Sequence, residues 1–371
     1  MAVWLSFNGA GLTSHAGYVL GYGSAPQPHP RPIEPGTVRF LFSNTDVQPY
    51  ARKISNTGTW TQVYDSETGE PIPGMWDYAP GDYSTNFQGN LPPRNMSIEK
   101  CGGLVDIVDI SLSGTIGNSS FFEDAFNGAT SLNNVNIESM KSAVSCIGMF
   151  RNCANVRKAN VLMETATTTE TMFDNCTGLS KAYIRTNTGI KNMAFSGCTG
   201  LTDLTIEILN DGWFLFQNRH DDFTGAQYLR NITFIAPEYS TYTLHRSGLA
   251  GADQNTFEGL IYLESILTYE RSIAYPEQLT QVPLPIGASG QKCFSSCTGL
   301  RGMPYLDVSH VTLAREMFMG CLNMESGIYD MYLALSDHIS DSSQYRNCFR
   351  DCGSNTESGS AELAQIPAAW K

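Results

Sequence analysis

The chain has 371 residues, with 23 Lys and Arg against 36 Asp and Glu, so its formal net charge at pH 7 is −13. Binding to a nucleic-acid backbone or to an anionic membrane requires clustered basic residues, and this balance argues against both partners. No apolar run approaches the roughly 20 residues of a spanning helix, and the first residues lack the basic and apolar regions of a secretory signal. We therefore expect neither membrane insertion nor signal-directed export.

Residues 1–23 are rich in Gly and aromatic residues, and a proline-rich segment over 24–36 follows them. Prolines at this density predict an extended, semi-rigid spacer. Two interpretations of residues 1–23 stay open, a disordered tail or an anchor peptide that docks on a larger assembly. The peptide is aromatic rather than charged, unlike most disordered tails, which favours the anchor. Its anchoring residues would be Trp4, Phe7, Tyr18 and Tyr22.

Residues 37–97 are predicted to form a small β module. The segments 37–42 and 59–64 are rich in β-branched and aromatic residues, and a turn over 65–70 follows them. Such a module would cap the open first edge of a repeat array, which an array needs for solubility. A sugar-binding aromatic patch around Trp76 and Tyr83 is the alternative.

An internal repeat occupies residues 98–352. Its unit reads [Met/Ala/Cys]-Phe-x-[Asn/Gly]-Cys-x-x-Leu-x-x-Leu-x-Ile, and successive copies begin 22 to 37 residues apart. The copies start at Phe126, Phe150, Phe173, Phe195, Phe223, Phe257, Phe294, Phe318 and Phe349. Each unit contains one short alternating segment, so stacked units predict a solenoid with a parallel β-sheet along one side.

The cysteines follow the repeat, which accounts for most of them without disulfides or zinc. Cys behaves as a small, often buried apolar residue, so the repeated Cys and Phe positions are predicted to lie in the core. One position is shared by Cys153, Cys176, Cys198, Cys297, Cys321 and Cys352, and Cys293 and Cys348 directly precede a repeat Phe.

The end of the chain is predicted to close the array. Residues 325–337 have the apolar spacing of a helix. Residues 353–371 form the C-terminal cap, in which Ile366, Pro367 and Trp370 would cover the last repeat.

These repeats resemble the BspA-type leucine-rich repeats and the related Met-Phe-x-x-Cys repeats of many bacterial and phage surface proteins. The likeness covers about residues 98–352, and it implies a leucine-rich-repeat-like parallel β-sheet array. The tail from Cys348 to Lys371 resembles the closing segment of repeat proteins carried by phages and prophages of gut bacteria. The second likeness implies a place on a phage particle.

No motif for catalysis, a cofactor or a metal stands out. None of the six histidines has a second metal-binding residue at a known motif spacing, and phosphate-binding loops and nucleophile elbows are absent from the sequence. Carboxylate pairs such as Asp106 and Asp109 are common on solvated surfaces. We predict no catalytic residue, no metal site and no cofactor.

The sheet surface is the remaining candidate for function. Residues eight and ten positions after each repeat Phe should point outward, where a polar, mixed-charge face is suited to bind a glycan or a protein. An ordinary solvated face is the alternative. The candidates are Asn134, Asn136, Lys158, Asn160, Lys181, Tyr183, Asp203, Thr205, Asn231 and Thr233.

With these likenesses, the sequence predicts a non-enzymatic phage virion protein of the tail, a fiber or the head surface. It would be assembled in the host cytoplasm, contact other particle proteins through its N-terminus, and bind a host cell-surface glycan or protein through its solenoid. Oligomers are possible. The alternatives are a bacterial cell-surface adhesin of the same repeat family and a polysaccharide-degrading enzyme of the tailspike kind.

Overall fold

The structure is a computed structural model that describes residues 3–5, 14–16, 28–34, 37–42, 59–79, 107–113, 126–137, 145–164, 169–186, 195–209, 226–237 and 255–371. Of the predicted anchor residues, Phe7, Tyr18 and Tyr22 lie outside this part of the chain. Trp4 lies in β1 (Val3–Leu5), which pairs antiparallel with β2 (Ser14–Ala16).

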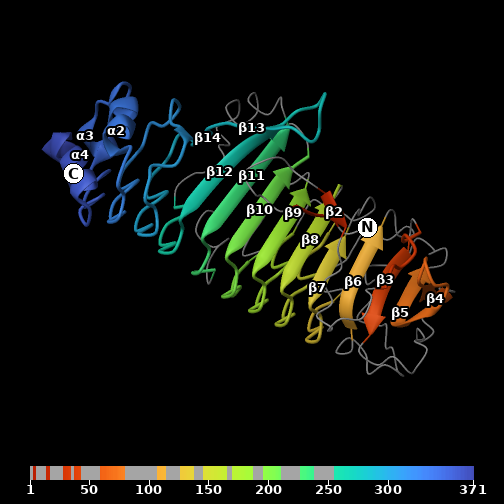
Figure 1. Ribbon diagram of the computed structural model, residues 1–371. Helices are drawn as coiled ribbons and strands as arrows, with labels where there is room; N and C mark the ends of the chain where they lie inside the picture. The colour runs from red at the N-terminus through yellow and green to blue at the C-terminus, as the bar shows by residue number, and fades with distance from the viewer. Residues whose placement is uncertain are drawn as a thin grey trace.

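One long sheet runs through most of the described molecule, with the helices gathered at its far end (Figure 1). Seven consecutive strands are parallel, and each belongs to one repeat, which confirms the predicted solenoid. They are β6 (Ile107–Ser113), β7 (Asn134–Ile137), β8 (Lys158–Met163), β9 (Lys181–Thr186), β10 (Asp203–Ile208), β11 (Asn231–Pro237) and β12 (Ser265–Arg271).

The N-terminal module extends this sheet beyond its first parallel strand. β3 (Thr37–Phe42) pairs antiparallel with β6 and with β5 (Pro71–Ala79), and β5 pairs with β4 (Thr59–Tyr64). The strands predicted over 37–42 and 59–64 are thus confirmed. Phe40 is fully buried, and its ring centroid lies 6.5 Å from that of Phe126, the first repeat Phe. The module therefore shares both the sheet and the core of the repeats.

Part of the predicted spacer is packed against this module. The backbone N–H of Ser66 donates to the carbonyl of His29 at 2.7 Å, and the N–H of Arg31 donates to the carbonyl of Tyr64 at 3.4 Å. The carboxylate of Asp65 accepts the N–H of His29 at 2.6 Å, and this bond, with others from its own turn, lowers the pKa of Asp65 to about 2. Residues 28–34 thus lie along β4, whereas the sequence predicted a spacer throughout residues 24–36.

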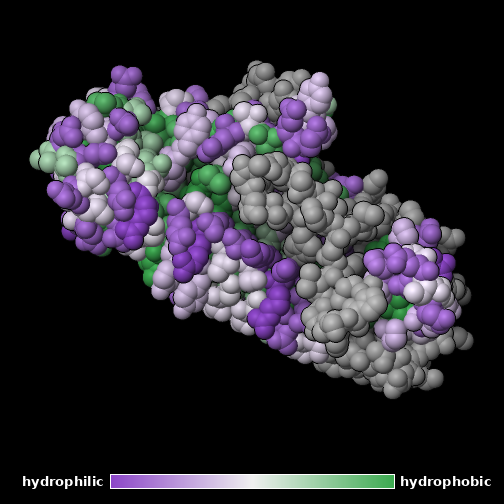
Figure 2. All heavy atoms as spheres, viewed as in Figure 1, coloured by the Kyte–Doolittle hydropathy of each residue, from purple (hydrophilic) through white to green (hydrophobic). Residues whose placement is uncertain are grey.

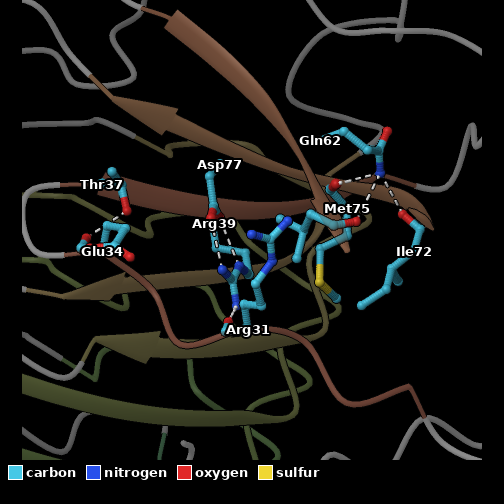
Figure 3. A network of polar contacts seen from close by, with 9 residues as sticks. Arg31, Glu34, Thr37, Arg39, Gln62, Ile72, Met75 and Asp77 are labelled. Carbon is cyan, nitrogen blue, oxygen red and sulfur yellow. Dashed lines mark hydrogen bonds and ion pairs between the residues drawn. The ribbon is translucent and has the colours of Figure 1, made fainter. Parts of the chain in front are cut away.

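A buried arginine adds a second link to that segment. Arg39 makes two hydrogen bonds of 2.7 Å to the carboxylate of Asp77 and one of 2.6 Å to the carbonyl of Arg31 (Figure 3). Its charge is buried but paired, which is the condition under which a buried charge is tolerated. Because Asp77 belongs to β5, this contact connects the proline-rich segment to the middle of the module.

Among the described residues, the repeat phenylalanines form two stacked runs inside the solenoid. Phe126, Phe150, Phe173 and Phe195 have ring centroids 5.3, 5.4 and 5.9 Å apart, with interplanar angles of 7°, 15° and 2°. Further along the chain, Phe257, Phe294, Phe318 and Phe349 stack at 5.2, 5.3 and 5.6 Å. Offset aromatic stacking adds about 0.5–1.5 kcal/mol per pair beyond the burial of area, so each repeat stabilises the next.

The repeat cysteines bind the preceding repeat. The thiol of Cys176 donates to the carbonyl of Phe150 at 3.0 Å, and Cys153 makes the same bond to Phe126 at 3.1 Å. Burial raises the pKa of the Cys153 thiol to about 12, so it stays protonated and able to donate. All nine cysteines among the described residues are buried and none forms a disulfide there, including Cys146, which lies outside the repeated positions. The repeated cysteine position is therefore suited to a small side chain that can donate a hydrogen bond.

Two residues of each turn have left-handed backbone conformation, two positions before and two positions after the repeat Phe. The second position is Gly, Asn, Ser or Asp in the described copies, for example Asn175 (φ 59°) and Gly197 (φ 69°). These residue types visit this conformation at the lowest cost, which explains the Asn/Gly position of the repeat. The first position is less uniform, and in one copy it is the β-branched Thr171 (φ 52°).

The long sheet ends before the repeats do. The insertion after β12 folds back as β13 (Leu279–Gln281), which pairs antiparallel with β12 and occupies the edge where another parallel strand would bind. The same insertion also contains β14 (Leu284–Pro285), which forms a short parallel pair with β15 (Leu306–Asp307) of the Phe294 repeat. We expected a strand in every repeat. Pro283, Pro285 and Pro304 lack the N–H that a continuous ladder needs, whereas the Phe stack does not depend on those bonds.

Helices close the far end. They are α2 (Ile328–Ser336), α3 (Ser342–Tyr345), α4 (Glu357–Gln365) and the short 3-10 helix η3 (Ala368–Trp370). The helix predicted within 325–337 is confirmed, and Ile328, Met331 and Leu335 form its buried side. Trp370 is buried, stacks on Tyr345 at 3.9 Å and lies 6.3 Å from Phe349. No helix in the described residues has the length and hydropathy to cross a bilayer.

Replacing Thr171 by Gly should stabilise the fold. Thr171 combines a positive φ with a β-branched side chain, and its hydroxyl is buried without a hydrogen-bond partner among the described residues. We expect the free energy of unfolding to rise by up to about 1 kcal/mol, since relief of strain exceeds the added chain entropy. The matched change Gly148→Thr, at the same turn position of the preceding repeat (φ 58°), should lower it by roughly 1–2 kcal/mol. Thermal unfolding measures both, and shifts of the same sign would contradict this account.

Candidate functional site

The sheet register aligns the ten predicted binding residues in two parallel columns. In the first column, Lys158 pairs with Asn134 and Lys181, and Asp203 pairs with Lys181 and Asn231. The second column, two residues further along each strand, contains Asn136, Asn160, Tyr183, Thr205 and Thr233. The ten side chains thus come from five adjacent strands, which are about 4.8 Å apart.

The first column is the more accessible of the two and is internally hydrogen-bonded. Asp203 accepts from the amide of Asn231 at 2.9 Å and lies 3.5 Å from the ammonium of Lys181. Burial raises the pKa of Asp203, but the bonds from Asn231 and Thr202 and the charge of Lys181 outweigh it, so its pKa is lowered. Lys181 is exposed. This column therefore presents fixed charges and amides to an incoming partner.

The second column is less open than the sequence suggested. Asn136 and Asn160 are buried, with 8% and 5% of their surfaces exposed, and the amide of Asn160 donates to the side-chain oxygen of Asn136 at 2.7 Å. Tyr183, Thr205 and Thr233 are half-buried. We expected the whole column to face solvent, and for the two asparagines this prediction is wrong. Both are engaged in contacts of the protein itself.

A third column, twelve positions after the repeat Phe, adds a charged cluster that the sequence analysis missed. Glu207 is buried, accepts a hydrogen bond from Arg271 at 2.6 Å and also accepts one from the hydroxyl of Tyr183. The guanidinium of Arg185 lies 5.3 Å from the centroid of the Tyr183 ring. We call Tyr183, Arg185, Glu207 and Arg271 the Tyr183 cluster. Counting outward positions beyond the second column, twelve and fourteen residues after the repeat Phe, would have found Arg185, Glu207 and Arg271, but not the pairing of Glu207 with Arg271.

The chemistry of the Tyr183 cluster favours a structural role. Burial, and then the negative charge of Glu207, raise the pKa of Tyr183, so its phenol remains a hydrogen-bond donor. A general acid or base needs a pKa near the working pH, and this phenol is far from that. Arg271 and Glu207 lie 64 residues apart in the chain. Their contact therefore holds the end of β12 against β10.

The other sequence candidates do not come together as a site in the described structure. Asp106 lies outside the described residues, and Asp109 pairs with Asn134 in the sheet register. Trp76 packs against the main hydrophobic core, which argues against its use in the alternative aromatic patch, and Tyr83 lies outside the described residues. The described part of the chain contains no group of three or more His, Cys, Asp and Glu side chains that could hold a metal ion.

Comparison with known proteins supports the repeat family. Residues 105–217 match the model of the BspA type leucine rich repeat region in six copies. This segment is therefore a BspA-type leucine-rich repeat region. The match covers β6 through β10, the strands that contribute eight of the ten predicted binding residues. It establishes the repeat and leaves its ligand open.

Two solved structures are similar at low identity. A leucine-rich repeat protein from Bacteroides ovatus is 17% identical over 58% of this chain and 53% of its own, with a TM-score of 0.29. This chain thus spans about half the length of that protein. A leucine rich cell surface protein from Faecalibacterium prausnitzii is 17% identical over 78% of this chain and 86% of its own, with a TM-score of 0.25. No curated protein matches the sequence.

Replacing Glu207 by Ala should destabilise the protein strongly. The change leaves the guanidinium of Arg271, which is 23% exposed, without its carboxylate partner. Loss of one member of a largely buried pair is expected to lower the free energy of unfolding by roughly 3 kcal/mol. As a control, Glu325→Ala removes the exposed pair with Arg301 and should change it by less than about 1 kcal/mol. Equal losses in thermal unfolding would show that the Tyr183 cluster does not hold the sheet.

Proposed function

We propose that the chain is a non-enzymatic surface recognition protein whose sheet face binds a host cell-surface glycan or protein. The observation that carries this proposal is the alignment of ten polar side chains in two columns across five adjacent strands, of which all but Asn136 and Asn160 are at least partly exposed. An extended, rigid face of repeated units suits recognition, because its side chains are held by the sheet and lose little entropy on binding.

The chemistry of the first column supports a polar partner. This column contains positive and negative charges as well as hydrogen-bond donors and acceptors. They come from Lys158, Lys181, Asp203 and Asn231. Glycans and polar protein surfaces are recognised by such hydrogen-bonding groups rather than by bulk hydrophobicity. On the face drawn in Figure 2, hydrophobic residues of the described surface occur only in small separate areas.

Binding is a better use of this face than catalysis. On this face, the buried Glu207 is paired with Arg271, and Tyr183 is held as a hydrogen-bond donor to Glu207. An acid–base enzyme of the glycosidase kind needs two carboxyl groups facing a groove with different pKa values. Asp203 is paired with Lys181 and Glu207 with Arg271, so neither is available as such an acid.

Removal of charges from the first column should weaken cell binding strongly. We expect the labelled full chain to bind intact cells of at least one strain in a panel of gut bacteria. The double variant Lys181→Ala, Asp203→Ala should bind at least about tenfold more weakly, since each lost charged hydrogen bond contributes roughly 1–3 kcal/mol. Flow cytometry measures the binding, and Asp330→Ala, at an exposed position on α2, is the control. Unchanged binding by the double variant would exclude the sheet face.

We propose in addition that the protein is displayed on a phage particle, to which residues 1–23 attach it. The aromatic composition of that segment and the likeness of the C-terminal tail to phage-carried repeat proteins support this proposal. The docked segment over residues 28–34 would transmit the attachment to the β module through Asp65 and Arg39. A bacterial cell-surface adhesin of the same repeat type is the alternative, and it would use the same sheet face.

Deletion of residues 1–23 should abolish attachment to particles. The full chain and the shortened chain are mixed with phage particles purified from a strain that lacks this gene, and are then sedimented. We expect only the full chain to sediment with the particles. The shortened chain keeps the docked segment, so equal melting temperatures verify its fold. If neither chain sediments, the cell-surface adhesin becomes the better account, and the sheet-face proposal stands unaffected.

A further inference from the structure

Two neighbouring repeats depart from the pattern together, at the turn that leads into the sheet. Most described copies have Cys, then any residue, then Gly or Asn, as in Cys176-Thr-Gly178 and Cys297-Thr-Gly299. The copies that lead into β11 and β12 have Ala226 and Leu260 in place of Cys, and Tyr228 and Tyr262 in place of Gly. These two repeats thus lack the hydrogen bond of the cysteine thiol and gain two large aromatic rings. The position of these rings on the surface suggests what they do.

The two tyrosines stack on each other at the edge of the solenoid. Their ring centroids are 5.2 Å apart, and the side chains are 44% and 38% exposed. Stacked on each other, the two partly exposed rings present one continuous aromatic surface. The pair therefore forms a short aromatic platform.

The platform ends abruptly on one side. The equivalent residue of the following repeat is Gly299, and a Cβ atom there would lie only 2.5 Å from the carbonyl oxygen of Leu263 and 2.7 Å from the carbonyl carbon of Tyr262. Close approach of the two backbones thus requires glycine at this position. Because Gly299 has no side chain, no third ring continues the stack. A hollow of about 370 Å³ lies there, lined by Tyr262, Glu264, Thr298, Gly299, Arg301 and Asn323 among others.

The charged side chains around the hollow form pairs of opposite charge, so their net charge is zero. Arg230 is paired with Glu264, and Arg301 lies 3.5 Å from Glu325. A guanidinium has five N–H donors, so Arg301, which lines the hollow, keeps donors for a ligand beyond its pair with Glu325. The guanidinium of Arg230 lies 5.7 Å from the centroid of the Tyr262 ring. The surroundings thus offer many hydrogen-bonding groups but no net charge, which favours a neutral polar ligand over an anion or a cation.

We propose that this hollow is a binding site for a neutral saccharide, with one pyranose ring stacked on Tyr262. A pyranose ring has an apolar C–H side, which packs on an aromatic ring, and hydroxyl groups that bond to Arg301, Glu264 and Thr298. The volume falls within the roughly 300–1,000 Å³ typical of small-molecule sites, and the open geometry suits one unit of a longer chain. The site lies at the turn edge rather than on the two sheet columns, so it goes beyond the function proposed above.

The test uses the full chain and a panel of neutral oligosaccharides of glucose, galactose, mannose and N-acetylglucosamine. Saturation-transfer NMR and titration measure binding. We expect at least one oligosaccharide to bind, and Tyr262→Ala to weaken its binding about tenfold or more, because it removes the stacking surface. Tyr262→Phe keeps that surface and should stay within about threefold of the original chain. Tyr275→Ala, at another exposed tyrosine, is the matched control and should change nothing.

Three results would overturn the proposal. They are the absence of binding to any neutral oligosaccharide, a preference for acidic ones, and unchanged binding by Tyr262→Ala. Loss of cell binding by Tyr262→Ala without competition from any oligosaccharide would indicate a protein partner instead. The variant Lys181→Ala, Asp203→Ala separates the two proposals, since it should keep oligosaccharide binding at the hollow even where it loses cell binding through the sheet face.

Discussion

The stack of repeat phenylalanines is the interaction on which the rest of the structure depends. Each ring covers the next at 5.2–5.9 Å within the two described runs. The stack sets the rise of the solenoid, and that rise brings the thiols of five repeat cysteines within reach of the carbonyl of the preceding Phe: Cys153, Cys176, Cys198, Cys297 and Cys321. Left-handed residues on both sides of the Phe turn the chain sharply enough for the next strand to begin in register. In a solenoid, each repeat contacts only the repeats next to it. The distance between successive Phe rings therefore sets the distance between successive repeats along the array.

Each end of this stack is closed by an aromatic residue from outside the repeats. Phe40 of the N-terminal module lies against Phe126, and Trp370 lies against Phe349. The two closures differ in construction. The N-terminal module also continues the sheet by antiparallel pairing, whereas the C-terminal end uses helices after the long sheet has stopped. An exposed terminal repeat would present an apolar face and unpaired backbone groups, and both ends avoid this.

Surface function is separated from this core by the alternation of the strands. Inward residues such as Leu204 and Ile206 are buried, whereas Thr205 between them lies at the surface and is half-buried. The same separation exists in the turns, where Leu229 and Leu263 are fully buried while Tyr228 and Tyr262 stand at the surface. Repeats can therefore acquire a polar column or an aromatic platform at little expense to the fold. The Tyr183 cluster is the exception, since Glu207 and Arg271 are outward residues that contribute to holding the sheet together.

The repeat, the residues that share the core and the columns that share a strand position could all be predicted from the order of the amino acids. The reason is that a local period of Phe, Cys and Leu places every copy in the same environment, so that Asn134 and Lys158 had to become neighbours. The tertiary structure alone decided which outward residues stay accessible, because the burial of Asn136 and Asn160 depends on the packing around their strands. It also decided where the sheet ends, since β13 folds back on β12 through an insertion that has no period. Two further features also required the tertiary structure, because they bring together residues that are distant in the chain. They are the pairing of Glu207 with Arg271 and the hollow beside Tyr262.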